Sequence, residues 1–282
     1  MSEYQYYEFQ AIDRPLTREE QEAVARLSSR VEPHPRRAVF VYNYSDFRGD
    51  PEKVLAQYYD AMFYFANWGS RHLLFRFPAA LVDVAEMQQY SIPTDDDPPS
   101  EAITVEQTDD YVVLGIRLDE EEGFGWVEGE GWLDRLIGLR EALLQRDYRV
   151  LYLAWLKGIT LEYNVDRDAL EPPIPPGLAA LTPPLQTFVE LFDVDADLLD
   201  SAAGRSPALK PAKINQARMR LALQGMTEEE KDAFLLRLLN DEPRLSLALH
   251  QHLGLSPAAP PAVAGLRRTV GDLLDAIGLD DE

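Results

Sequence analysis

The chain contains no cysteine, and this absence excludes several kinds of chemistry at once. Disulfide bonds, thiolate zinc sites, iron–sulfur clusters and a cysteine nucleophile all require that residue. Histidine is also scarce, with 4 residues in 282. His250 and His252 would project about 200° apart on a helix, so they could not share a metal ion. No serine stands in a nucleophile context such as Gly-x-Ser-x-Gly, and the sequence therefore predicts no catalytic residue and no cofactor.

Long apolar runs are missing as well. No stretch approaches the roughly 18 residues that a membrane-spanning helix needs. The first residues, Met1-Ser2-Glu3-Tyr4, lack the basic and apolar regions of a signal peptide. We therefore expect a cytoplasmic protein without a membrane partner.

Basic residues are outnumbered: 27 Lys and Arg stand against 49 Asp and Glu, which gives a formal net charge of -22. The imbalance is greatest from Asp95 to Asp134, where fourteen acidic residues accompany one basic residue, Arg117. Such an acidic surface repels nucleic-acid phosphate and anionic lipid. Nucleic acid is for this reason not the expected partner.

The strand and helix patterns that are present predict an α+β fold. Aromatic and β-branched runs predict strands over residues 4–12, 38–44, 71–77, 103–107 and 111–118. The last two flank Thr108-Asp109-Asp110 and predict a hairpin, and with the helices between the other strands they favour a mixed sheet packed with helices.

Helix-start signals are clear at several places. Thr17 with Glu20 and Thr227 with Glu230 have the spacing of a capping box. Asp50-Pro51 is an N-cap followed by proline, and the almost entirely apolar segment after it predicts one long buried helix to about Trp68 that contains Met62 and Phe65. Further helices are expected over residues 78–90, 132–145, 149–159, 185–192, 196–203, 214–224, 227–240 and 243–253.

Proline-rich stretches suggest how the chain is divided. Four prolines between Glu171 and Gly177 favour an extended linker, and a second linker of Pro and Ala is expected at 256–262. The predicted organisation is an α+β domain over 1–170, the linker 171–177, an all-helical region over 178–255, the second linker, and an amphipathic helical tail over 263–282.

Several segments resemble a family of bacterial cytosolic proteins of uncharacterised function. The most specific segment is the opening, Tyr-Gln-Tyr-Tyr-Glu-Phe-Gln-Ala-Ile-Asp-Arg-Pro-Leu-Thr, over residues 4–17. The others are residues 46–51, 66–69, 129–133 and 172–178. The resemblance implies a shared fold and a bacterial origin, and it carries no activity, cofactor or catalytic residue.

The acidic stretch could serve as a metal site or as a solvated surface. Its carboxylates are the hard oxygen ligands that calcium and magnesium prefer. The candidate ligands are Asp95, Asp96, Asp97, Glu120, Glu122, Glu128 and Glu130. They lie in loops without a recognised ligand spacing, so a solvated acidic surface is the favoured interpretation. The glycines of the same loop do not predict a phosphate site, because the surrounding carboxylates would repel the anion.

One segment has the opposite charge. Between Gly204 and Gly225 there are basic residues and no acidic ones, and the candidates for partner binding are Arg205, Lys210, Lys213, Arg218 and Arg220. Pairing with the protein's own acidic region or with an acidic protein is favoured over nucleic acid, because no aromatic side chain for base stacking lies among them.

Three functions from different classes remain open at this point. The leading hypothesis is a non-catalytic cytosolic adaptor or regulatory protein that binds other proteins. The alternatives are a metal-dependent hydrolase that uses the acidic-loop carboxylates and a nucleic-acid-associated regulator. The identity of the partner and the oligomeric state are left undetermined by the sequence.

Overall fold

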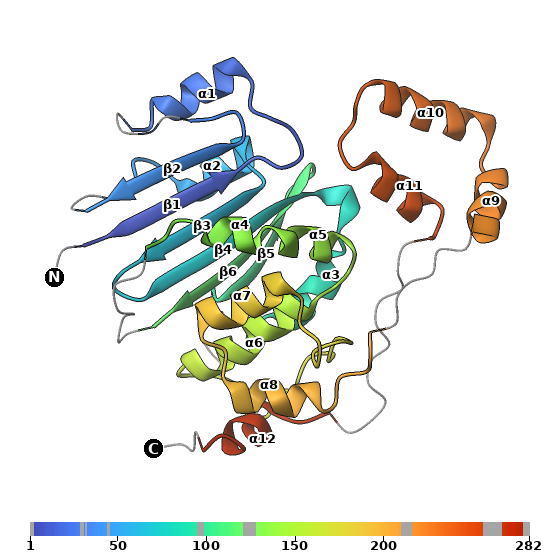
Figure 1. Ribbon diagram of the computed structural model, residues 1–282. Coiled ribbons are helices and arrows are strands. Elements are labelled where there is room, and N and C mark those ends of the chain that lie inside the picture. The colour runs from blue at the N-terminus through green and yellow to red at the C-terminus, as the bar shows by residue number, and fades with distance from the viewer. Residues whose placement is uncertain are drawn as a thin grey trace.

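A six-stranded antiparallel sheet forms the centre of the protein (Figure 1). The structure is a computed structural model that describes residues 3–28, 31, 33–43, 46–94, 99–120, 128–209, 216–255 and 267–278. The strand order is β2-β1-β3-β4-β6-β5. The strands are β1 (Gln5–Gln10), β2 (Arg37–Tyr42), β3 (Ala61–Ala66), β4 (Ser70–Pro78), β5 (Ile103–Gln107) and β6 (Tyr111–Asp119).

The α+β class is confirmed, and the predicted hairpin is present as β5 and β6. Every neighbouring pair of described strands is antiparallel, in place of the mixed sheet that we expected. One cause of the difference is the short turn between β3 and β4, which was predicted to be part of a helix. A tight turn can join only antiparallel strands, whereas a parallel pair needs a long crossover.

The long helix expected from Asp50 to Trp68 is wrong in its second half. Asp50 caps a helix that ends early, α2 (Pro51–Tyr58), and the chain then continues as strand β3. All six residues of β3 are buried, because it is an inner strand with packed layers on both faces. A strand of this kind is a continuous apolar run and lacks the alternation of a half-exposed strand. Met62 and Phe65 are buried as predicted, but in a strand.

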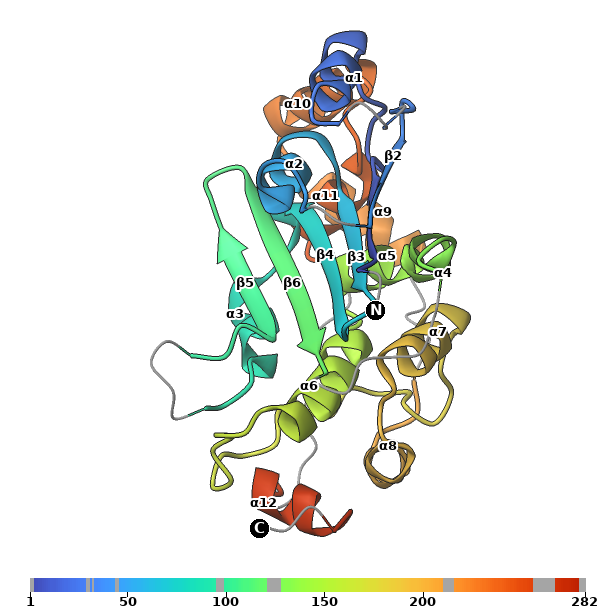
Figure 2. The ribbon, with the colours of Figure 1, turned by 90° about the vertical axis from the view of Figure 1, so that its left-hand side faces the viewer.

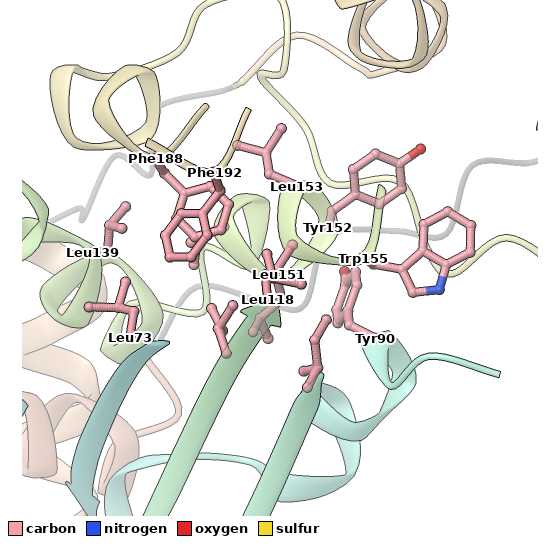
Figure 3. Close-up of a cluster of buried hydrophobic side chains, with 14 of the residues drawn as sticks. Leu73, Tyr90, Leu118, Leu139, Leu151, Tyr152, Leu153, Trp155, Phe188 and Phe192 are labelled. Carbon is pink, nitrogen blue, oxygen red and sulfur yellow. The ribbon is translucent and has the colours of Figure 1, made fainter. Parts of the chain in front are cut away.

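Two hydrophobic cores lie on opposite faces of the sheet. One face packs against α1 (Arg18–Ala25) and α2, with Phe9, Phe40 and Leu55 in its core. The larger core lies on the other face, where Phe188 and Phe192 meet the apolar face of α6 (Figure 3). The helices on that side are α4 (Trp132–Leu136), α5 (Gly138–Leu144), α6 (Arg149–Leu161), α7 (Pro183–Phe192), α8 (Ala196–Ala203) and α12 (Val270–Asp275). Short helical turns between β4 and β5 close one end of this core: η1 (Ala79–Leu81), α3 (Val84–Met87) and η2 (Gln88–Tyr90).

The helices of the larger core do not reach the whole sheet. In Figure 1, α4 and α5 lie in front of the inner strands and α6 and α7 lie at their lower ends, while none of the described helices crosses the front of β1 and β2. Figure 2 shows α4, α5 and α7 together on one side of the strands. The outer part of this sheet face, on β1 and β2, is therefore left without a covering helix.

The segment Glu171–Gly177, where we expected an extended linker, is largely buried. Glu171 is 1% exposed and Ile174 is 4% exposed. Glu171 accepts hydrogen bonds from Tyr152 of α6 and from Arg268, at the start of the last helical segment. The prolines thus form an extended segment inside the larger core. Whether residues 1–170 fold as a separate domain stays a prediction.

Three further helices form a small group beside the sheet: α9 (Gln216–Gln224), α10 (Glu228–Leu239) and α11 (Leu245–His252). Figure 1 shows them to the right of the layered body, apart from α6, α7 and α8. The predicted capping boxes at Thr17 and Thr227 are both confirmed. Over the described part of the chain, no helix is long and apolar enough to cross a membrane.

Candidate functional site

A cavity of about 500 Å³ lies on the uncovered face of β1 and β2. Side chains that alternate along the two strands form its floor, because every second residue of a strand points to the same face. The lining residues are Tyr4, Tyr6, His34, Arg37, Val39, Val41, Glu128 and Glu130. A volume of this size is within the range of small-molecule sites.

An ion pair between the buried Glu8 and the partly exposed Arg37 lies beneath the cavity. Glu8 is fully buried, and its carboxylate lies 2.8 Å from Nε of Arg37 on the neighbouring strand. Tyr6 Oη donates a hydrogen bond to Glu8 Oε2 at 2.8 Å, and Gln10 Nε2 donates to Glu8 Oε1 at 3.0 Å. These partners compensate the cost of burying the carboxylate. Burial and the adjacent Glu8 raise the pKa of Tyr6 above its ordinary value, so the phenol remains a hydrogen-bond donor.

Residues 128–131 form one wall of the cavity. The backbone of Gly129 lies against the ring of Tyr6, where a Cβ at residue 129 would be 2.4 Å from Tyr6 Cγ. The Gly129 N–H faces Tyr4 Oη at 3.5 Å, and Trp132 Nε1 donates to the Glu128 carbonyl at 3.1 Å. Burial raises the pKa of Tyr4, and the nearby charges of Glu128 and Glu130 add to this effect. The two carboxylates therefore lie at the Tyr4 end of the cavity.

A second concave surface lies between α9, α10 and α11. It is an apolar groove of about 440 Å³. The groove residues are Leu223, Met226, Lys231, Phe234, Leu235, Leu238, Leu245, Ser246 and Leu249. Lys231 is the one charged residue among them, and it is paired with Glu228 at 2.9 Å.

The leucines around this groove remain exposed. Leu235, Leu238 and Leu239 are 56%, 59% and 79% exposed. Met226 is the one buried residue among those of 216–255. Large exposed apolar patches on a soluble protein mark interaction surfaces more often than single exposed leucines do. The three helices therefore pair into a groove without forming a core of their own.

The groove has a defined attachment to the rest of the molecule. Arg244, just before α11, donates from Nε to Asp13 at 2.9 Å and is paired with Glu141 of α5. Gln251 Nε2 donates to the Leu81 carbonyl at 2.9 Å, and Leu247 packs on the larger core. This attachment is made through α11 and leaves α9 and the outer side of α10 facing solvent.

Of the predicted metal ligands that the structure describes, only Glu128 and Glu130 are brought together. Glu120 is paired with Lys157 at 2.6 Å, and Glu128 and Glu130 line the sheet cavity. Asp95, Asp96, Asp97 and Glu122 lie outside the described residues. In the described part of the chain, no three acidic or histidine side chains form a group that could hold a metal ion.

The predicted basic strip is divided between two parts of the fold. Arg205 follows α8 and lies 3.9 Å from Glu171, while Arg218 of α9 donates to the Gly254 carbonyl at 3.3 Å. Arg220 is exposed on α9. Lys210 and Lys213 lie outside the described residues. A role of these side chains in partner binding remains a prediction, and the contact of Arg205 is intramolecular.

Sequence reasoning did not find either concave surface. The aromatic residues of β1 predicted a strand, but nothing local to them indicates that residues 128–131 approach from more than a hundred positions away. For the groove, the signal was present in Phe234-Leu235-Leu236 and Leu238-Leu239, which place apolar residues on several sides of one helix.

Comparisons with models of known protein families, with curated proteins and with solved structures found no match to this chain. The resemblance of the opening segment to bacterial cytosolic proteins therefore stays a prediction.

Proposed function

We propose that this is a non-catalytic protein-binding protein whose groove between α9, α10 and α11 holds an amphipathic helix of another protein. The observation that supports it most directly is the set of leucines exposed around a ready-formed apolar groove. An amphipathic helix laid in a groove buries leucine-type anchors spaced by three or four residues, which matches the shape and chemistry present here.

The charges around the groove select the partner's chemistry. Glu228, Asp232, Leu235 and Leu239 follow one another at helical spacings of four, three and four, so acidic and apolar residues share one exposed side of α10. Glu228 is engaged by Lys231, but Glu229 and Asp232 are exposed as well. With a net charge of -22, the protein attracts cationic surfaces at long range. The partner helix should therefore carry lysine or arginine beside its apolar face.

A peptide titration tests this proposal with the full chain. The probe is a labelled synthetic amphipathic helix with leucine anchors and lysine flanks, and its counterpart has the same anchors and glutamate flanks. Fluorescence anisotropy should show the lysine peptide binding about tenfold more tightly or better, with the difference narrowing as salt is added.

Matched variants locate the binding. Leu235→Ser with Leu238→Ser should weaken binding of the lysine peptide by about tenfold or more, since each buried leucine contributes roughly 1.5–3 kcal/mol. Leu236→Ser is the control, because Leu236 is 61% exposed on the same helix but does not line the groove. Equal loss in both variants, or no binding of either peptide, would contradict the proposal. So would a dimer in light scattering that the double variant converts to monomer, because a second copy would then occupy the groove.

The two alternatives have weaker support. Both a metal-dependent hydrolase and a nucleic-acid-associated regulator would need clusters of charged residues. Among the described candidates, no three acidic side chains form a metal-binding group, and Arg205 lies apart from the arginines of α9 and close to Glu171. No specific observation favours either one.

A further inference from the structure

The cavity on β1 and β2 is independent of the groove, and we propose that it binds an organic ammonium cation with an apolar body. Three features of the cavity match such a ligand: two carboxylates and the ring of Tyr4 for the cation, and a hydrophobic wall for the apolar body. None of them takes part in the protein-binding role proposed above.

The cation is recognised at the Tyr4 end of the cavity. Glu128 and Glu130 both line it and are exposed, so their carboxylates are accessible to a ligand. Tyr4, just before β1, lines the cavity with them and is only partly buried, and an ammonium group within about 6 Å of a tyrosine ring is attracted by the negative face of the ring. Tyr6 is buried beneath the backbone of Gly129, so its ring is not open to the ligand. Carboxylates and aromatic rings together are selective for a cation over a neutral group of equal size.

The apolar part of the ligand lies along the strands. Val39 and Val41 alternate with buried residues on β2, and Val41 is directly opposite Tyr6 in the register of the two strands. Arg37 lies at the end of the cavity away from Tyr4. It does not make that end strongly cationic, because its charge is compensated by the fully buried Glu8. The local charge balance is therefore acidic, and the field of the whole molecule adds to it.

Ligand-observed NMR with the full chain tests the proposal, using hexylammonium, hexanol and hexanoate as probes. The three share an apolar chain and differ in the charge of the head group. Hexylammonium should bind about tenfold more tightly than hexanol, and hexanoate should not bind measurably. Equal binding of hexylammonium and hexanol, preference for hexanoate, or no binding of any probe would overturn the proposal.

Two double variants separate the site from the general field of the protein. Glu128→Gln with Glu130→Gln removes two charges at the cavity and should weaken hexylammonium binding by about tenfold. Glu106→Gln with Asp109→Asn removes two exposed charges at β5 and the β5–β6 turn, near the other edge of the sheet, and should leave binding within about twofold. Tyr4→Leu keeps both carboxylates and should also weaken binding. An equal loss in the two double variants would show attraction by the field alone and would contradict a site. Because the lysine-flanked peptide is tested with leucine variants of the groove, either proposal can fail without the other.

Discussion

Asp13 connects three distant parts of the chain through two arginines. Arg140 of α5 donates from both terminal nitrogens to Asp13, at 2.9 and 2.7 Å, and Arg244 donates from Nε at 2.9 Å. Arg140 is 1% exposed, and Asp13 is the nearer of its two carboxylate partners, the other being Asp60 at 3.8 Å. Burial acts to raise the pKa of Asp13, but the hydrogen bonds and charges of Arg140 and Arg244 outweigh it and hold that pKa below its ordinary value of 3.8.

Asp13→Ala should lower the free energy of unfolding by about 3–5 kcal/mol, because it removes the two hydrogen bonds that Asp13 accepts from the buried guanidinium of Arg140 and leaves Asp60, at 3.8 Å, as its nearest carboxylate. Chemical denaturation at neutral pH measures the loss, with exposed Asp109→Ala as the control. The sign of the pH effect follows from the depressed pKa: the stabilisation by Asp13 is present above the ordinary carboxyl value of 3.8 and is lost as pH falls through the lower folded value. The difference in the free energy of unfolding between wild type and Asp13→Ala should therefore become smaller in acid. A difference that stays constant down to pH 2 would contradict stabilisation by the ionised Asp13.

Burial of single residues and helix caps are features that the sequence predicted correctly. Phe65 and Met62 are buried as expected, and Thr17, Asp50 and Thr227 cap helices as their spacing predicted. Caps and burial depend on neighbours a few positions away or on apolar character alone, so a single sequence contains that information. Contacts such as Asp13 with Arg244 join residues that are far apart in the chain and carry no local signal.

At the scale of elements, α2 and β3 show why the boundary between a helix and a strand was missed. The run from Ala61 to Ala66 is apolar at every position, and periodicity cannot distinguish a short buried helix from a buried strand. The useful signal was the turn that follows, Asn67-Trp68-Gly69, because glycine at a tight turn predicts a hairpin. In the structure Gly69 has φ +118° and its N–H donates to the Ala66 carbonyl at 3.2 Å.

Gly69→Ala tests how strongly this turn determines the hairpin. A Cβ at residue 69 would lie 1.8 Å from the Glu120 carbonyl oxygen, so the chain at the end of β6 would have to shift. An alanine there would also be strained, because Gly69 has a positive φ. Gly49→Ala is a matched control, since Gly49 has φ +116° and a Cβ there would meet no atom within 4 Å. Gly49→Ala should lower the free energy of unfolding by roughly 1–3 kcal/mol through backbone strain alone, and Gly69→Ala should lower it by more than that. Thermal melts of the two variants compare them, and equal losses would contradict a steric role for the Glu120 contact.

In the whole molecule, the packing indicates one continuous body and, beside it, the α9–α11 group, of which α9 and α10 contribute no residue to the cores. Phe188 and Phe192 of α7 belong to the same core as the strands, and Val270 of α12 joins that core too. The proline-rich segment after residue 170 therefore lies within a continuous core, while the α9–α11 group is held mainly through α11.

Two shortened proteins distinguish these roles. A fragment of residues 1–170 lacks α7, α8 and α12 and should not show a cooperative thermal transition, because burying each large aromatic side chain such as Phe188 contributes roughly 1.5–3 kcal/mol, comparable with much of a domain's net stability. A chain in which residues 210–266 are replaced by a flexible glycine–serine linker keeps that core and should unfold cooperatively, at a somewhat lower temperature because Asp13 loses Arg244. Calorimetry of both proteins measures these transitions.

A stable 1–170 fragment would support a domain boundary near residue 170, as the prolines suggested. It would show that α7 packs onto a core that is already complete without it. If the protein with the glycine–serine linker is unfolded, the α9–α11 group is required for folding of the whole chain. The exposed leucines of the groove would then have a role in folding as well as in partner binding.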